Sequence, residues 1–308
     1  MKNKYLQHLG ADGALGALAA RCKVAALAGL LLAATLPMAA MPTVDTMTGG
    51  PWQGNPLYYG YVDGGTAGEA QFHTPYALVL DDSGESMFVA DRDNNAIRFI
   101  DADAGQTYTM ITQWLNKPVG IARDSSGNIY VLNRGNGNNG NVLTFDMYGD
   151  FVATNAVALT NANGMARDIN GNLYLTVQNN TVIRVTPAGV KSVVATVPHA
   201  GAVLRGLTVK YNGLLAVCDS GRHGIYLINP NTGVITTNAG FHGAGDFSLP
   251  NNTASAASAK FNQPYGVIEA GDGNLVVSDF GNHRVKYVLA SGVVTNLYGV
   301  SSNYWLGP

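Results

Sequence analysis

The chain has 308 residues with a net charge of −2, and only 12% of them are charged while 46% are hydrophobic. This length suffices for one large domain or two small ones, and the hydrophobic content excludes a disordered chain. No block of Lys or Arg is present, so the sequence indicates neither a nucleic-acid-binding nor a polybasic membrane-binding surface. The 38 glycines and 15 tyrosines are typical of an all-β protein with many tight turns.

The N-terminus differs in kind from the rest of the chain. Basic residues, Lys2, Lys4, Arg21 and Lys23, precede a short apolar run at 24–36. That length suits the core of a signal peptide better than a membrane-spanning helix. We therefore expect residues 1–40 to be a signal peptide cleaved after Ala40, with a retained N-terminal membrane anchor as the alternative. The expected location is outside the cytoplasm (periplasmic, extracellular or cell-surface), with membrane contact only through an uncleaved N-terminal segment.

Cysteine use agrees with this expectation. Cys22 leaves with the signal peptide, so Cys218 is alone in the mature protein and no internal disulfide can form. Cys218 lies where other repeats carry Ala or Ser, which predicts a small buried residue rather than a nucleophile.

A repeat dominates the remainder, 41–308. Its units begin at a Pro-x-Gly or related step, followed by a β-branched strand, a Gly-Asn turn and a second strand that often ends in Asp. The equivalent positions are spaced by 43, 44, 42 and 60 residues, at Ala77, Gly120, Gly164, Gly206 and Gly266. A period in the forties with four short strands per unit is the signature of a β-propeller. The expected units span about 72–112, 114–157, 159–197, 203–240 and 261–299.

Two features complicate a ring of five blades. Long connections at 49–75 and 241–264 precede the first and fifth units, and both end in Ala-x-Phe followed by Pro, which marks them as the same element. The segment 43–49 also reads as a fourth strand, as does 293–299. The fold expected is therefore an all-β propeller of five four-stranded blades, with a partial sixth blade as an added hypothesis.

The pattern of Pro-x-Gly, Gly-Asn-Leu, Val-x-Asp and Asn-His-Arg-Val resembles the NHL-repeat propeller family over about residues 43–299. The fifth unit carries the Asn282-His283 signature intact, the first has Asn94-Asn95, and the second departs most, with RGNGNNGN at 134–141. The resemblance implies the architecture; it leaves the function open, because propellers host unrelated activities.

The loops between second and third strands should emerge on the same face as the connections between blades. That face would collect polar residues and act as the default binding surface. Its candidate residues are Arg92, Asp93, Arg134, Arg222, His223 and His283. Asp91, Asp219 and Asp279 recur at one repeat position, which favours a role in holding the turn over acid catalysis.

Better candidates are positions at which the blades differ. Immediately before the repeat glycine, at the expected mouth of the central channel, stand Tyr76, Val119, Asn163, Arg205 and Tyr265. We predict that Tyr76, Asn163, Arg205 and Tyr265 form a pocket for a carboxylate or other polar ligand; a merely solvated channel is the alternative. Three residues beyond the glycine, Arg123, Arg167 and Glu269 form either a charged cluster or a structural ion pair.

The evidence for catalysis is weaker. His73 and His199 lie in connections where propeller lyases of the peptide-amidating type hold metal, but the other units lack histidines there. Gluconolactonase-like propellers need a Glu, an Asn and an Asp around one cation, and only Glu269 and Asn163 fit. We expect no catalytic residues, metal site or cofactor. The predicted function is an exported scaffold that binds a protein or a small polar ligand; a propeller hydrolase or lyase (gluconolactonase-like or amidating-lyase-like) at the channel mouth is the alternative.

Overall fold

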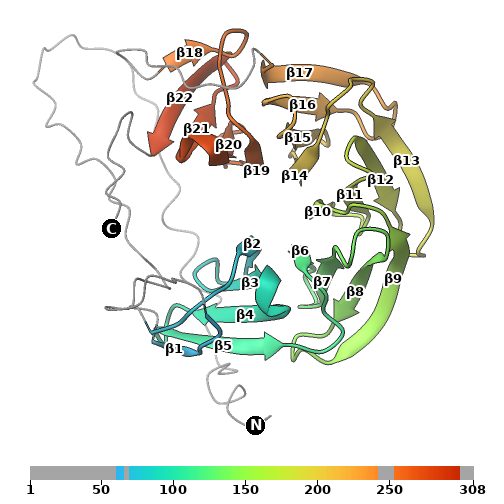
Figure 1. Cartoon of the computed structure of the whole chain (residues 1–308), viewed down its shortest axis with the longest axis vertical. Helices are drawn as coiled ribbons and strands as arrows, with labels where there is room; N and C mark the ends of the chain where they lie inside the picture. The colour runs from blue at the N-terminus through green and yellow to red at the C-terminus, as the bar shows by residue number, and fades with distance from the viewer. Residues whose placement is uncertain (1–59, 66–68, 242–252, 299–308) are drawn as a thin grey trace, which may run out of the picture. The chain divides into compact units, whose positions relative to one another are not determined.

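The computed structural model describes residues 60–65, 69–241 and 253–298. These residues form an all-β propeller of five antiparallel sheets arranged around a common axis, as expected (Figure 1). The three middle blades have four strands each, and the first and fifth have five. The signal peptide expected at 1–40 and the strand expected at 43–49 lie outside the described residues, so the signal peptide, its cleavage site and the partial sixth blade stay predictions.

In each blade the four strands of the repeat follow one another from the axis outward; the extra strand of the first and fifth blades comes first in the chain but lies at the outer edge. The first blade contains β1 (Gly64–Gly65), β2 (Pro75–Leu80), β3 (Met87–Asp91), β4 (Ala96–Asp101) and β5 (Gln106–Ile111), with the short 3-10 helix η2 (Arg92–Asn94). The second contains β6 (Pro118–Arg123), β7 (Ile129–Asn133), β8 (Gly140–Phe145) and β9 (Phe151–Leu159). The third contains β10 (Gly164–Arg167), β11 (Leu173–Val177), β12 (Thr181–Val185) and β13 (Lys191–Thr196).

The fourth blade contains β14 (Leu204–Val209), β15 (Leu215–Asp219), β16 (Gly224–Ile228) and β17 (Ile235–Gly240). The fifth contains β18 (Thr253–Ser255), β19 (Pro264–Glu269), β20 (Leu275–Asp279), β21 (Arg284–Val288) and β22 (Val293–Tyr298), with the 3-10 helix η3 (Phe280–Asn282). Within the described ranges, no helix is long and apolar enough to cross a membrane.

The repeat glycines allow the innermost strands to approach one another. The innermost strands are β2, β6, β10, β14 and β19, and each lies beside the next one in this order (Figure 1). A Cβ atom added at Gly164 would lie 2.4 Å from the backbone oxygen of Arg205, and one at Gly206 would lie 2.6 Å from that of Tyr265. Real Cβ atoms do not tolerate such distances, so only glycine lets adjacent inner strands come this close.

The hydrophobic core lies between neighbouring blades rather than in one centre. On β6, Ile121 packs toward the first blade and Ala122 toward the third, with only 6% and 7% of each exposed. The corresponding position to Ile121 on β2 is Leu78, and that to Ala122 on β19 is Ile268; each is 60% exposed. The first and fifth blades face each other in the ring. Their facing sides are therefore less buried than the sides of blades that pack together elsewhere in the propeller.

The described parts of the two long connections share two features, in line with their common Ala-x-Phe. Each adds a fifth strand to the outer edge of its blade, since β1 pairs with β5 and β18 pairs with β22. Each then buries its alanine completely, Ala70 in one and Ala259 in the other.

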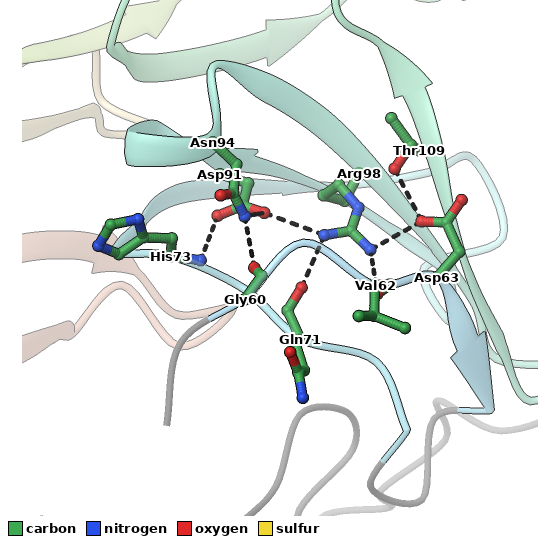
Figure 2. A network of polar contacts seen from close by, with 9 residues as sticks. All are labelled: Gly60, Val62, Asp63, Gln71, His73, Asp91, Asn94, Arg98 and Thr109. Atoms are coloured by element: carbon green, nitrogen blue, oxygen red, sulfur yellow. Dashed lines mark hydrogen bonds and ion pairs between the residues drawn. The ribbon is translucent and has the colours of Figure 1, made fainter. Parts of the chain in front are cut away.

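A buried cation in each of these blades binds the connection. In the first blade, the Arg98 guanidinium donates to the Asp91 carboxylate at 3.0 Å and to the backbone oxygens of Gln71 at 2.8 Å and Val62 at 2.7 Å (Figure 2). It also lies 2.7 Å from the Asp63 carboxylate (Figure 2). These bonds tie the connection to β3 and β4.

Candidate functional site

The loops between second and third strands gather at one end of the axis, and we call this the polar end. In the first and fifth blades these loops are η2 and η3. The Asn94 amide donates to the Asp91 carboxylate at 2.8 Å (Figure 2), and the Asn282 amide donates to Asp279 at 2.7 Å. The next residue has a left-handed backbone, with φ 53° at His283. Asn and His tolerate that region better than most residues, so the Asn-His signature is explained by turn geometry.

The repeated aspartates also hold the incoming connections. The carboxylates of Asp91, Asp219 and Asp279 accept backbone N–H bonds from His73 at 2.7 Å, Val203 at 2.9 Å and Asn262 at 2.7 Å. All three aspartates are fully buried. Their position and partners match the expected structural role at the turn.

The four residues predicted at the channel mouth lie together at the polar end. The rings of Tyr76 and Tyr265 meet edge to face with their centroids 6.2 Å apart, which joins the first and fifth blades at the axis. The Arg205 guanidinium lies over the Tyr265 ring, 4.9 Å from its centroid, a cation–π arrangement. We call Tyr76, Asn163, Arg205 and Tyr265 the axial cluster.

Asn163 positions Arg205 and is itself inaccessible. Its side-chain oxygen accepts a hydrogen bond from Arg205 Nη1 at 3.0 Å, and its amide donates to the backbone oxygen of Leu204 at 3.2 Å. Asn163 is only 1% exposed. Ser220 supports the same guanidinium by accepting from Arg205 Nε at 3.2 Å. The guanidinium is thus fixed by two neutral groups.

Two groups of the axial cluster have unused binding capacity. Arg205 forms no ion pair with any of the described residues. The Tyr76 hydroxyl is buried and has no hydrogen-bond partner of normal geometry among the described residues, although the Arg205 guanidinium lies near it. Burial raises the pKa of Tyr76, and the charge of Arg205 opposes that rise. The neutral hydroxyl of Tyr76 therefore lies beside the Arg205 guanidinium, which has hydrogen-bond partners but no ion pair among the described residues.

An exposed aromatic ring extends this cluster. Phe280 stacks on Tyr265 with centroids 4.7 Å apart and is 57% exposed. Sequence reasoning missed Phe280 and Ser220, although both follow the repeat aspartate, at a position where the blades differ. The first blade carries Arg92 there, and its guanidinium lies 5.9 Å from the centroid of the Tyr76 ring.

The other residues predicted on the polar end differ in how close they lie to the axial cluster. Asp93 lies 3.4 Å from Arg92 Nε. Arg134 is close enough to lower the pKa of Tyr76. His223 Nδ1 accepts the backbone N–H of Gln263 at 3.1 Å, which ties the fourth blade to the fifth. Arg222 lies beside Tyr226, whose pKa its charge lowers against the effect of burial. Neither His223 nor Arg222 contacts the axial cluster through any interaction that the described residues show.

The charged residues beyond the repeat glycine do not form one cluster. Arg123 reaches back to Asp82 of the first blade at 3.3 Å, and Arg167 lies over the Tyr130 ring of the second. Glu269 pairs with Lys210 of the fourth blade at 2.6 Å. Each joins two neighbouring blades, which is the structural role left open as the alternative.

No cluster of three His, Cys, Asp or Glu residues that could hold a metal ion occurs in the described part of the chain. Cys218 is completely buried, as expected for a small core residue. Burial raises its pKa well above the usual value, and the charges of Asp279 and Asp219 raise it further.

No protein-family model and no curated protein sequence matches this chain. Solved structures do match it. An auxiliary nutrient-binding protein from Bacteroides ovatus aligns with a TM-score of 0.67 and 16% identity, over 82% of this chain and 63% of that one. A streptogramin B lyase aligns with a TM-score of 0.55 and 18% identity, over 74% of this chain and 69% of that one.

A chain of a nidogen/laminin complex aligns with a TM-score of 0.59 and 20% identity, over 72% of this chain and 78% of that one. The chain spans less than two thirds of the length of the nutrient-binding structure. At these identities the likeness concerns the fold alone, and binding proteins and lyases share that fold. The chain is a five-bladed β-propeller.

Proposed function

We propose that this propeller is a non-catalytic binding protein whose axial cluster captures a small ligand that carries a carboxylate and a flat apolar face. The observation that carries the proposal is the Arg205 guanidinium, held over the Tyr265 ring by Asn163 and without an acidic partner among the described residues. A guanidinium that is fixed and unpaired favours a carboxylate, which can accept two of its N–H groups.

The aromatic rings define the rest of the ligand. Tyr265 and Phe280 stack on each other beside the guanidinium, and Phe280 is largely exposed. Such rings stack against the flat face of a sugar or an aromatic acid. The buried Tyr76 hydroxyl can donate a hydrogen bond to a ligand oxygen, since its raised pKa keeps it protonated at neutral pH.

Saturation-transfer NMR with matched pairs of small molecules tests this function. The pairs are galacturonate with galactose and benzoate with benzamide, which differ in their charge. We expect the protein to bind at least one acid about tenfold or more tightly than its neutral partner, because a hydrogen bond to a charged group contributes about 1.5–3 kcal/mol. Arg205→Ala should abolish the preference and Tyr265→Ala should abolish binding, with the fold intact by circular dichroism. Equal binding of acid and neutral partner, or undiminished binding in both variants, would refute the axial site.

The same experiment separates binding from catalysis. A propeller hydrolase or lyase would convert the bound molecule, and the ligand's NMR signals would change with time; a binding protein returns it unaltered. Metal content after purification gives a second criterion, because one tightly held divalent ion on the axis would favour an enzyme. The raised pKa of Tyr76 disfavours its use as a general base at neutral pH, which argues against one catalytic role that an enzyme could give to this cluster.

We further propose that the chain is an NHL-type propeller that acts outside the cytoplasm on a protein or a small polar ligand. Support for the NHL relationship comes from the Asn-His turn and the repeat glycines, each of which has a physical reason in this fold. Support for export comes from the apolar run at 24–36. Mass spectrometry of the secreted protein would test export with cleavage, because a cleaved signal peptide leaves a protein that lacks residues 1–40.

A further inference from the structure

We propose a second binding site at the polar end, between the first and second blades, for a phosphate or sulfate group. A cavity of about 450 Å³ lies there, lined by Arg92, Lys117, Arg134 and residues 135–137. The three cationic side chains come from η2, from the connection between β5 and β6, and from the loop after β7. No residue of the axial cluster lines this cavity, although Arg92 also lies over the Tyr76 ring, so the two sites are neighbours with separate lining residues.

The three cations occupy positions at which the blades differ. Arg92 and Arg134 each follow the last residue of the second strand, where the other blades have Gln178, Ser220 and Phe280. Lys117 precedes the innermost strand, where the first, third and fifth blades have Thr74, Asn161 and Gln263. The repeat itself does not require a positive charge at either position. In this cavity the first and second blades bring three cations together.

The backbone that carries these side chains is held in place. Lys117 has a left-handed backbone with φ 51°. Its N–H donates to the Asn95 side-chain oxygen at 2.8 Å, and its carbonyl accepts from the N–H of Arg134 at 3.0 Å. Two cationic residues of the cavity are therefore hydrogen-bonded to each other through their backbones. This arrangement sets the places of the charges before a ligand binds.

The inserted loop of the second blade leaves the cavity open. Gly135 and Gly137 have φ 62° and 96°, values that favour glycine. The closest atom to a Cβ added at Gly137 would be the Asn161 side-chain oxygen at 3.9 Å, so the backbone at Gly137 borders free space. The departure of 134–141 from the repeat thus produces one wall of the cavity.

The charges of the cavity are not balanced by the described residues. Arg92 lies 3.4 Å from Asp93, and no ion pair involves Lys117 or Arg134 in the ranges that the structure describes. Nearby Asp91 is fully buried and both of its oxygens are taken by other donors. Two guanidinium groups and an ammonium group with one carboxylate leave an excess of positive charge.

This excess matches a tetrahedral oxyanion. Arginine binds such groups through two parallel N–H bonds, and lysine adds a point charge. The cavity is open to solvent, so the bound group can carry a substituent that extends out of it. Phosphate and sulfate esters share this chemistry, and free phosphate is the simplest probe for both.

Isothermal titration calorimetry of the full chain tests this site with inorganic phosphate, sulfate and acetate at one ionic strength balanced with chloride. We expect saturable binding of phosphate or sulfate and much weaker binding of acetate. Arg134→Gln and Lys117→Gln introduce a residue that other blades carry at those positions, and each should weaken binding by about tenfold or more. The relative affinities for phosphate and sulfate show which of the two groups the site prefers.

Controls separate this site from general charge effects and from the axial cluster. Lys191→Gln removes the same charge from β13, where Lys191 is exposed, and should leave the affinity unchanged. Arg205→Ala should remove carboxylate binding at the axial cluster while phosphate still binds. The proposal is overturned if no oxyanion saturates the protein, if the cavity variants bind as well as the parent, or if Arg205→Ala abolishes phosphate binding. Melting curves followed by circular dichroism confirm that each variant folds.

Discussion

Arg98 in the first blade and Lys286 in the fifth occupy equivalent positions and have the same structural role. Each is completely buried, each binds the repeat aspartate of its blade, and each donates to a backbone oxygen of the incoming connection. Lys286 Nζ lies 2.5 Å from the Asp279 carboxylate and 4.7 Å from the centroid of the Phe261 ring, and Arg98 lies 4.9 Å from that of Phe72. The blades with long connections therefore share one cationic clamp.

Replacing Arg98 by Met should strongly destabilise the propeller. The change leaves the Asp91 carboxylate buried without its cation, and breaking a buried ion pair in this way costs about 3–5 kcal/mol. Urea unfolding measures the loss of the free energy of unfolding. The matched control is Arg123→Gln, because its partner Asp82 is 76% exposed and such pairs contribute about 0.2–1 kcal/mol. Equal losses in the two variants would show that the Arg98 clamp has no special role.

The facing sides of the first and fifth blades should tolerate substitution. Leu78→Ala should change the free energy of unfolding by no more than about 0.5 kcal/mol, because that side chain is 60% exposed. The equivalent change in the second blade, Ile121→Ala, should cost about 2–5 kcal/mol, because Ile121 is 6% exposed. A similar cost in both variants would mean that Leu78 is covered in solution.

Cys218 should be inert in the folded protein. Because burial and two nearby aspartates raise its pKa well above 9.0, almost none of its thiol is ionised at pH 8. In a Cys22→Ser background, iodoacetamide should modify the protein very slowly until urea unfolds it, as mass spectrometry can follow. The raised pKa also implies that the folded state retains a proton that the unfolded chain releases, so stability should fall as pH rises above the unfolded thiol's pKa. Rapid modification without urea would contradict the buried placement.

Asn163→Asp should prevent a carboxylate from binding at the axial cluster, although the groups that would contact the ligand all remain. The new carboxylate would lie near Arg205 Nη1, which is 3.0 Å from the present amide oxygen, and would compete with the ligand's carboxylate. We expect affinity for the acidic ligand to fall about tenfold or more, while the affinity for its neutral partner changes little. Loss of both affinities to the same extent would instead indicate a general structural effect of Asn163.

Much of the fold follows from the repeat. Hydrophobic alternation, the Gly-Asn turns and the spacing of the repeat glycines predict the strands and the propeller, because each strand buries side chains against neighbouring blades. The fifth strands β1 and β18 were not predicted. Each pairs over only two or three residues, within a connection whose composition reads as a loop.

The axial cluster was also predictable, since a residue before the repeat glycine must lie near the axis. Phe280, Ser220 and Lys117 were missed. Their contribution depends on which blade lies beside which, and on side-chain directions that a single repeat does not reveal. Comparing the five blades position by position would have found them, because each stands where the other blades carry a different residue.

A crystal structure of the protein with the acid selected by the NMR experiment would test ligand binding at the axial cluster. We expect the ligand's carboxylate on the Arg205 guanidinium, its flat face on Tyr265 or Phe280, and a hydrogen bond from the Tyr76 hydroxyl. Binding at the opposite end of the axis, or in the cavity that Leu159, Gln178 and Lys191 help to line between the second and third blades, would contradict it.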